Sequence, residues 1–304
     1  TDTDGRFHSK WLNMMYPRLY LARNLLREDG VMFISIDDKE LYNLRRLCDE
    51  VFGEESFLIT LVWQRRQMAD SRNEDRASTD HEYVVCYRRQ TTRLKGNPID
   101  KTKYSNPDND PRGPWFSADL TGIANKEERP NLHYDLVNPE TGFVYPPSPN
   151  RGWSHAPDSM SRLIAEKRII WPPKLDGRPR HKKFLNEVTR HETGFSSWLD
   201  VGQTTEGTRV IQDLFGDKVF PFSKPISLMQ TLIDQATEDQ DGLILDFFAG
   251  SGTTAHAVLD VNKQDGGNRK FILVQLPEPT EREDYPTIAD ITKERVRRVI
   301  TKLN

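Results

Sequence analysis

The chain has 304 residues, of which 36% are hydrophobic and 29% are charged, and its formal net charge at pH 7 is −3. These values are ordinary for a soluble globular protein that is long enough for one large domain or two smaller ones. The net charge excludes a small, strongly basic DNA-binding module. No apolar run approaches the roughly 18 residues of a membrane-spanning helix, so we expect no association with a membrane.

Charge is spread unevenly along the chain. Residues 61–200 carry 23 Lys and Arg against 19 Asp and Glu, and the flanking residues are acidic overall. A mildly basic middle suits a nucleic-acid-binding face on a scaffold that is not itself basic. Chance variation over a stretch of this length explains the excess equally well.

The two cysteines and seven histidines exclude several kinds of site. Cys48 and Cys86 form no CxxC pair, and the histidines form no HxxxH-like cluster, so we predict no metal site. So few cysteines also favour a reducing, cytoplasmic compartment. Residues 1–5 have neither the basic start nor the apolar stretch of a signal peptide, which agrees with that location.

The first part of the chain alternates helices with strands. Apolar spacing predicts a helix over residues 11–26, a buried strand over 31–36 and a second helix over 38–52. Further strands are predicted over 57–63 and 82–87. This alternation predicts an α/β fold with a largely parallel sheet. Because no helix separates the last two strands, we expect them to form an antiparallel, hairpin-like edge.

The character of the chain changes at about residue 88. Prolines and turn residues crowd the sequence as far as residue 219, and only residues 158–167 have a clear helical pattern. We therefore predict an irregular inserted domain over residues 89–219, between two halves of an α/β domain at 1–88 and 220–304. Four of the six tryptophans fall in the insert, which predicts a small core of its own: Trp115, Trp153, Trp171 and Trp198.

The regular pattern resumes after the insert. A helix is predicted over residues 225–236, with proline at its start. A strand over 242–248, a helix over 253–262 and a strand over 269–276 follow in order. The last predicted element is an amphipathic helix over 287–303.

The turn after the strand at 242–248 carries the most informative motif, Asp-Phe-Phe-Ala-Gly-Ser-Gly-Thr-Thr, at residues 246–254. Gly250 and Gly252 allow a sharp turn and a close approach of the backbone to a ligand. The helix N-terminus and the nearby hydroxyl groups offer polar contacts. Gln275, at the end of the next strand, lies where a side chain can reach the ribose of a nucleotide-like cofactor.

Several ligands compete for this turn. A phosphate-binding P-loop is rejected, because no lysine follows Gly252. A dinucleotide site requires G-x-G-x-x-G/A, which Gly250, Gly252 and Ala255 match only weakly. S-adenosylmethionine (SAM) carries no phosphate and needs a close backbone approach more than an anion cradle. A glycine turn that binds no ligand also fits the motif.

A family resemblance ranks these alternatives. Residues 246–254 resemble the SAM-binding motif of DNA methyltransferases that methylate exocyclic amino groups. Nearly the whole chain is similar, in order, to the modification (Mod) subunits of type III restriction-modification systems. Residues 11–19 through 33–38 resemble the segment after the catalytic motif, and residues 81–87 resemble a later strand. Residues 222–225 resemble the Lys-Pro motif that opens the helix beside the cofactor.

The resemblance implies a SAM-methyltransferase (Rossmann-like) fold with a mixed, incomplete sheet and an inserted target-recognition domain that reads duplex DNA. It implies methyl transfer from SAM to adenine N6 with base flipping. Possible partners are a restriction (Res) subunit and, for the full-length protein, a second copy in a homodimer. It assigns the cofactor site to the following residues: Asp246, Phe247, Ala249, Gly250, Ser251, Gly252, Thr253, Thr254, Gln275, Lys224 and Pro225.

Part of the family pattern is missing. The catalytic Asp/Asn/Ser-Pro-Pro-Tyr/Phe motif is not matched by the Pro-Pro pairs at 146–147 and 172–173, and the family would place it upstream of Thr1. We therefore assign no catalytic residue and expect this chain to be an inactive fragment. Gln275 departs from the acidic residue that is usual at the ribose position, which Glu278 partly replaces.

Other interpretations stay open at this point. The chain can be a non-catalytic module that binds DNA or a partner, or a nicotinamide-dependent oxidoreductase. Adenine N6 and cytosine N4 are not separated by the residues present. Cytosine-C5 chemistry needs a nucleophilic cysteine, whereas Cys48 and Cys86 fit buried structural positions. Within the insert, a cation such as Arg178 or Lys182 is more simply a solvated surface charge than a base-reading residue. Gly252→Arg is expected to abolish SAM binding and leave the fold largely intact.

Overall fold

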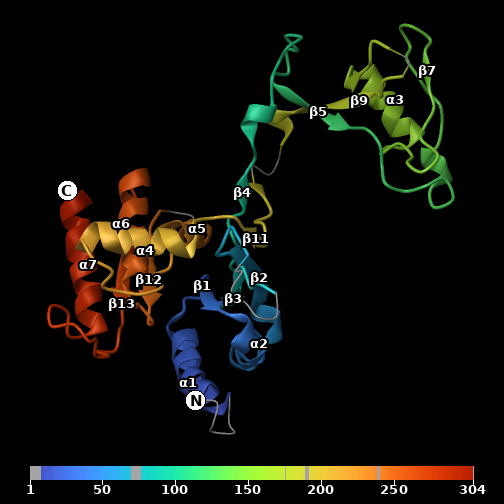
Figure 1. Cartoon of the computed structure of the whole chain (residues 1–304). Helices are drawn as coiled ribbons and strands as arrows, with labels where there is room; N and C mark the ends of the chain where they lie inside the picture. The colour runs from blue at the N-terminus through green and yellow to red at the C-terminus, as the bar shows by residue number, and fades with distance from the viewer. Residues whose placement is uncertain (1–7, 70–76, 175, 189–191, 238–239, 304) are drawn as a thin grey trace. The chain divides into compact units, whose positions relative to one another are not determined.

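A computed structural model describes residues 8–69, 77–174, 176–188, 192–237 and 240–303. Residues 1–5, expected to contain no signal peptide, lie outside these ranges. The chain divides into two compact units, drawn in Figure 1: Thr1–Asn97 together with Gly194–Asn304, and Pro98–Thr193. The second unit lies within the predicted insert of residues 89–219 and is shorter than it at both ends.

The larger sheet of the first unit has four strands in the order β1-β3-β2-β11. They are β1 (Val31–Ile36), β3 (His81–Arg88), β2 (Phe57–Gln64) and β11 (Trp198–Leu199). Strand β3 is antiparallel to both β1 and β2, and β11 is parallel to β2. The sheet is thus mixed, as the family resemblance implied.

The expectation of a largely parallel sheet was wrong, whereas the predicted antiparallel pair is present but does not form the edge of the sheet. Strands β2 and β3 do pair in antiparallel fashion, but β3 lies between β1 and β2. Four consecutive residues of β3, Val84 to Tyr87, are buried. A strand buried on both faces gains most from neighbours at both edges, because every backbone group then finds a partner.

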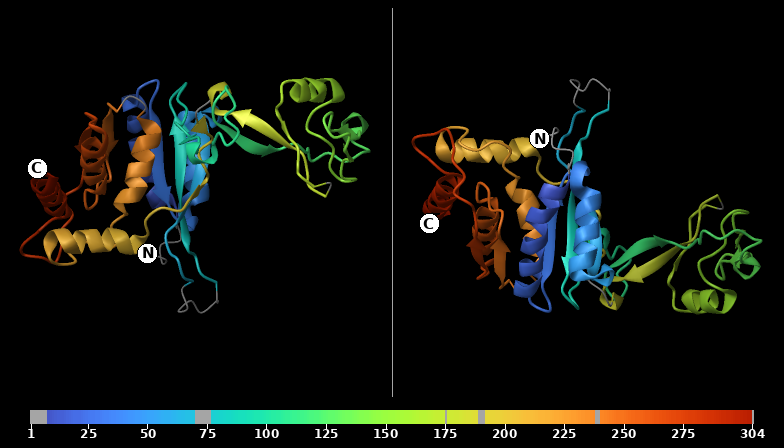
Figure 2. Two further views of the ribbon diagram at one scale, coloured as in Figure 1. Left: turned by 90° about the horizontal axis from the view of Figure 1, so that it is seen from above. Right: turned by 90° about the horizontal axis from the view of Figure 1, so that it is seen from below.

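Helices cover both faces of this sheet (Figure 2). On one face, α1 (Ser9–Leu25) and α2 (Asp38–Phe52) form a core with Val85 and Tyr87 of β3. Helix α2 begins where predicted, because the Asp37 carboxylate accepts a hydrogen bond from the Lys39 N–H at 3.2 Å. On the other face, α5 (Ile226–Ala236) packs against the sheet.

Helix α5 also packs against a second, parallel sheet of two strands, β12 (Leu243–Asp246) and β13 (Lys270–Leu273). Its Leu228 and Leu232 contact the first sheet, whereas its Ile233 packs against Ala257 and Val258. These two residues belong to α6 (Thr253–Asp265), which is followed after β13 by α7 (Ile288–Leu303). Both sheets therefore share α5 as a common support.

Helix α4 (Thr204–Phe215) was not predicted, because its residues were assigned to the irregular insert. Its sequence starts with two threonines and contains Gly207, which weakens the helical signal. The structure explains this glycine: a Cβ at residue 207 would lie 2.0 Å from the Ser223 carbonyl oxygen. Close packing against the 223–225 segment thus requires glycine where helix propensity disfavours it.

The second unit has a small core of its own, formed by Leu120, Leu136, Tyr145, Trp153, Met160 and Ile169. Its elements are β5 (Trp115–Asp119), β9 (Arg180–Phe184) and β8 (Ile169–Ile170) in one sheet, the hairpin β6 (Leu136–Val137) and β7 (Val144–Tyr145), and α3 (Pro157–Ala165). The short strands β4 (Asn97–Pro98) and β10 (Glu192–Thr193) pair where this unit begins and ends. Trp198, counted in the predicted insert, lies instead in β11 of the first unit.

No helix within the described ranges is both long enough and apolar enough to cross a membrane.

Candidate functional site

The turn from β12 to α6 forms the candidate site. Its two glycines have left-handed backbone conformations, with φ of +51° at Gly250 and +81° at Gly252. Gly252 is the N-cap of α6 and provides no side-chain cap. The N–H groups of the first helical turn therefore have no partner within the helix. This is the strand, Gly-x-Gly turn and helix that the sequence predicted.

The Asp246 side chain makes two hydrogen bonds within this turn. Its carboxylate accepts a hydrogen bond from the Phe248 N–H at 3.0 Å and another from the Thr254 hydroxyl at 2.6 Å. The Ala249 N–H donates to the Val274 carbonyl at 3.2 Å, which ties the turn to the neighbouring strand. Phe247 and Phe248 stack at a tilt with ring centroids 5.3 Å apart, and Phe248 is 51% exposed.

The other two hydroxyls of the motif face the protein interior. Ser251 and Thr253 are buried, and both bond to the Ser223 hydroxyl, at 2.9 and 3.1 Å. Both also accept hydrogen bonds from the guanidinium of Arg295, at 2.8 and 2.9 Å. These hydroxyls are thus engaged within the protein, so the backbone is the polar surface that the turn offers to a ligand.

Gln275 and Thr292 hold the backbone of Gly250 from two sides. The Gly250 N–H donates to the Gln275 side-chain oxygen at 2.8 Å, and the Thr292 hydroxyl donates to the Gly250 carbonyl at 2.5 Å. The Gln275 amide nitrogen in turn donates to the Glu278 carboxylate at 3.3 Å. The polar residue expected at the ribose position and its acidic neighbour therefore lie together beside the turn.

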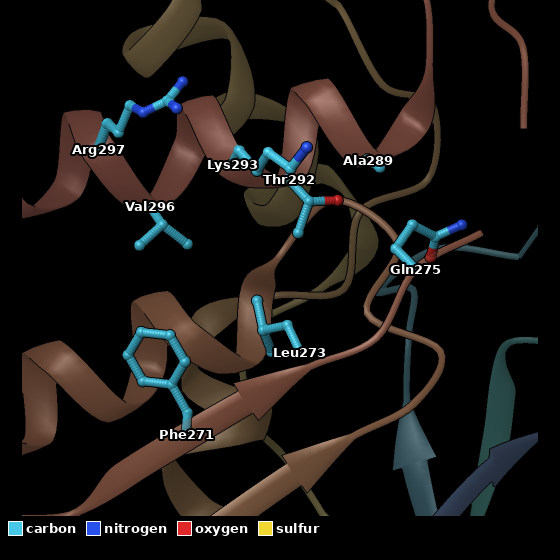
Figure 3. Close-up of a pocket in the computed structure, with 8 residues that line it drawn as sticks. All are labelled: Phe271, Leu273, Gln275, Ala289, Thr292, Lys293, Val296 and Arg297. Carbon is cyan, nitrogen blue, oxygen red and sulfur yellow. The ribbon is translucent and has the colours of Figure 1, made fainter. Parts of the chain in front are cut away.

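A cleft of about 380 Å³ opens next to these residues, between β13 and α7 (Figure 3). Phe271, Leu273 and Val296 supply apolar walls, and the polar lining comes from Gln275, Thr292, Lys293 and Arg297. Its volume falls in the range of small-molecule sites, which combine apolar walls with few polar groups. The two side chains that hold Gly250 thus also line a cavity with both apolar and polar walls.

The Lys-Pro motif lies between the turn and the first sheet. Pro225 is the N-cap of α5. The Lys224 ammonium forms an ion pair with Glu82 of β3 and lies 4.8 Å from the centre of the Trp63 ring. The Arg65 guanidinium lies 3.7 Å from the same carboxylate. The structure therefore joins the 222–225 and 81–87 segments, which are far apart in the sequence.

Helix α1 also reaches this region. The guanidinium of Arg18 lies 5.9 Å from the centre of the Phe248 ring. Arg18 belongs to the 11–19 segment, so three of the stretches that carry the family resemblance gather around the turn. Order along the chain predicted their relationship, whereas the contacts themselves could not be read from the sequence.

Sequence reasoning missed three residues that hold the turn: Ser223, Thr292 and Arg295. One signal was present, because Arg295 lies four residues after Ile291 and four before Val299 in the last helix. All three are fully buried. A charged residue in the middle of an apolar stripe at helical spacing is unusual, and it marks a position with a specific partner.

Gly252 needs a corrected interpretation. A Cβ at this position would lie 3.2 Å from Thr292 Cγ2 and 3.3 Å from the Thr292 carbonyl oxygen. The glycine therefore accommodates α7 and not only a ligand. That Gly252→Arg leaves the fold largely intact stays a prediction, but even a Cβ there requires Thr292 of α7 to shift by a few tenths of an ångström.

Both cysteines are buried, as expected for structural residues. Burial raises the pKa of Cys48 and of Cys86 to about 12, so neither thiol ionises near neutral pH. Among the described residues, no group of three His, Cys, Asp or Glu side chains could hold a metal ion. In the second unit, Lys182 forms ion pairs with Asp108 and Asp110, so its charge is already neutralised within the protein.

Comparisons with known proteins agree on one family. Residues 2–282 match the family model described as DNA methylase. The chain is 36% identical to the type III restriction-modification enzyme StyLTI Mod subunit of Salmonella typhimurium, over 97% of this chain and 46% of that protein. It is 33% identical to the type II methyltransferase M.KpnI of Klebsiella pneumoniae, over 95% of this chain and 74% of that protein.

Among solved structures, the M1.HpyAVI–SAM complex is 12% identical, with a TM-score of 0.43, over 93% of this chain and 82% of that one. The chain spans about half the length of the type III Mod subunits that it matches. The family match covers most of the chain and includes the turn, the Lys-Pro segment and β3. The chain belongs to the DNA methylase family.

Proposed function

We propose that this chain is the SAM-binding and DNA-recognition part of a site-specific DNA adenine-N6 methyltransferase of the type III Mod kind. The observation that carries the proposal is the turn between β12 and α6, in which Gly250 and Gly252 lead the backbone into a helix N-terminus. Gln275 and Thr292, which hold Gly250, also line the neighbouring cleft. A relative that the chain covers over 74% of its length is named a methyltransferase, which supports the same activity.

The residues of the turn fit SAM in charge and shape. The N–H groups at the start of α6 suit the methionine carboxylate of SAM, because a helix N-terminus favours a negative charge. The cleft beside Gln275 suits the adenine ring, and Gln275 with Glu278 would bind the ribose hydroxyls. Lys224 and Pro225 would fix the start of α5 beside the cofactor. When bound, SAM supplies the methyl group from its sulfonium.

The DNA-binding part of the proposal concerns the insert. We assign residues 1–88 and 220–304 to the methyltransferase domain and residues 89–219 to target recognition, with Pro98–Thr193 as its compact part. Cations in that unit would contact phosphates, and other side chains would read base edges. A restriction subunit and a second copy of the full-length protein are proposed partners, in keeping with the names of the type III relatives.

Methylation of adenine needs groups that polarise its amine, and the Pro-Pro motif that provides them in this family is not matched within the 304 residues. We therefore propose that the chain alone binds SAM and DNA without turnover. Transfer of a labelled methyl from SAM to duplex DNA tests this, with the StyLTI Mod subunit as the positive control. Labelled N6-methyladenine made by this chain would overturn the proposed inactivity, and labelled N4-methylcytosine would also overturn the choice of base.

A simple titration distinguishes a second candidate function, that of a nicotinamide-dependent oxidoreductase, from the proposed methyltransferase. The G-x-G-x-x-A match supports it, but Gln275 takes the place of the acidic residue that binds the ribose in such enzymes. Quenching of NADH fluorescence on addition of the chain would favour this candidate. We expect no change in NADH fluorescence at cofactor concentrations at which SAM saturates the chain.

A further inference from the structure

Arg295 occupies an unusual position for an arginine. It lies in the middle of α7 and is fully buried, in line with Ile291 and Val299. Buried guanidinium groups normally face carboxylates, because an unpaired charge in the interior is costly. No carboxylate of the described residues forms an ion pair with Arg295, and its Nε–H has no hydrogen-bond partner there. A neutral apolar residue would fill this helix position at lower cost.

The partners of Arg295 are three hydroxyl groups and a histidine. Its Nη1 donates to Ser223, Ser251 and Thr253 at 3.1, 2.8 and 2.9 Å. Its Nη2 lies 3.4 Å from Nδ1 of His256. Burial, with the charge of Arg295 as the next cause, lowers the pKa of His256 to about 3, so the imidazole is neutral and can accept this hydrogen bond.

These hydroxyls come from the two segments that border the cofactor turn. Ser251 and Thr253 belong to the Gly-x-Gly turn, and Ser223 precedes the Lys-Pro motif. A hydroxyl that accepts from a cation is left to donate its own proton elsewhere, and the Ser223 and Thr253 hydroxyls lie 3.4 and 3.5 Å from the Lys224 carbonyl. One guanidinium thus links α7 to both segments through charge-assisted hydrogen bonds, which are stronger than neutral ones.

We propose that Arg295 is a positioning residue of the SAM site, which holds the Gly-x-Gly turn and the 223–225 segment in the geometry that receives the cofactor. Arg295 does not touch the ligand itself, because it is fully buried beneath the turn. The inference rests on the proposed function for its link to SAM. The ordering of the two segments can be measured without any ligand.

Amide hydrogen exchange in the free protein is the first test. Arg295→Met removes the charge and keeps a long apolar side chain, and we expect the amides of residues 250–254 to exchange about tenfold faster. Arg27→Met is the matched control, because the Arg27 side chain is 81% exposed and does not line the cleft. Its exchange in the turn should match that of the wild type. Should Arg295→Met fail to fold, Ser223→Ala removes a single partner and should produce a smaller rise confined to the same amides.

A double-mutant cycle separates positioning from core packing. Arg295→Met should weaken SAM binding by about tenfold in the wild type. In a Ser251→Ala and Thr253→Val background this loss should shrink, because two of the three hydroxyl partners through which Arg295 acts are already absent. A residue that merely fills the core would cost the same in both backgrounds.

The outcomes separate this inference from the proposed function. Unchanged exchange in the turn, or an equal rise at amides throughout the first unit, would overturn the positioning role of Arg295. An undiminished loss of affinity in the background that lacks the Ser251 and Thr253 hydroxyls would overturn it too. If the wild-type chain binds no SAM, the proposed function fails, and the exchange comparison still decides whether Arg295 orders the turn.

Discussion

Gly252 is constrained by its backbone conformation and by its neighbour at the same time. Its φ of +81° lies in the left-handed region, which costs a residue with a Cβ roughly 1–2 kcal/mol. In addition, a Cβ would approach Thr292 to 3.2 Å. Gly266, which ends α6, has a φ of +72° but no atom within 4 Å of an added Cβ. Substitutions at these two glycines therefore distinguish the effect of backbone strain from that of crowding against a neighbour.

We predict that Gly252→Ala lowers the free energy of unfolding by more than Gly266→Ala does. Gly266→Ala should cost about 1 kcal/mol from the left-handed backbone alone. Gly252→Ala should cost about 1 kcal/mol more, because α7 must give way at Thr292. Urea denaturation of both variants and the wild type measures the difference. Equal losses would show that contact with α7 does not constrain the turn.

His256 provides a prediction about pH. Its pKa is about 3 in the folded chain, because burial and then the charges of Arg295 and Lys302 disfavour the protonated ring. Asp260 lies 3.6 Å from its Nε2, and Asp213 of α4 lines the same small cavity. In the unfolded chain the pKa returns to its ordinary value of 6.5. Between these values the unfolded state binds more protons, so stability falls as the pH falls.

Replacing this histidine should therefore flatten the acid side of the stability profile. We expect His256→Gln, whose amide oxygen can still accept from Arg295, to lose about 2 kcal/mol less than the wild type between pH 7 and pH 5. Denaturant unfolding at a series of pH values measures this. Parallel profiles for the two proteins would contradict the lowered pKa.

At the scale of elements, α5 is the helix on which both sheets of the first unit depend. Beyond its apolar contacts, its buried Gln235 makes two hydrogen bonds with the backbone of Gly96, 139 residues away. The Gly96 N–H donates to the Gln235 side-chain oxygen at 2.8 Å, and the Gln235 amide donates to the Gly96 carbonyl at 3.0 Å. The Gln235 side chain thus supplies hydrogen-bond partners to both backbone groups of Gly96, which does not belong to a strand.

We predict that Gln235→Ala destabilises the chain by about 2 kcal/mol, because it leaves a buried N–H and a buried carbonyl without partners. Gln230→Ala, on the same helix, is the control and should cost no more than about 0.5 kcal/mol. Thermal or urea unfolding gives both values. A loss for Gln235→Ala no larger than that of the control would mean that water replaces these hydrogen bonds freely.

Elements with a strong local pattern could be predicted from the sequence. Helix α2 spans the predicted residues 38–52, and the turn between β12 and α6 lies where its glycines indicated. The predictions that failed concern features that depend on tertiary contacts. The central place of β3 depends on both of its neighbours, and α4 keeps a glycine because another segment packs against it. The hydrogen bond between Arg295 and Ser223 joins residues 72 positions apart, which no local pattern reveals.

At the scale of the whole molecule, the chain divides into a unit that carries the cofactor turn and a unit with its own core. Strands β4 and β10 pair where the second unit begins and ends, so its two ends meet. We predict that replacing Pro98–Thr193 by a short flexible linker leaves the first unit folded and able to bind SAM, and abolishes binding to duplex DNA. Circular dichroism, SAM titration and a DNA mobility-shift assay measure these properties. Retained DNA binding would contradict the role proposed for the insert.

Calorimetric titration of SAM into the complete chain tests the central proposal most directly. We predict saturable binding of one SAM per chain, competition by S-adenosylhomocysteine, and no binding of NADH at the same concentrations. This result would support a cofactor site at the turn between β12 and α6. A folded chain that releases no heat with SAM, or that binds NADH at least as tightly, would contradict it.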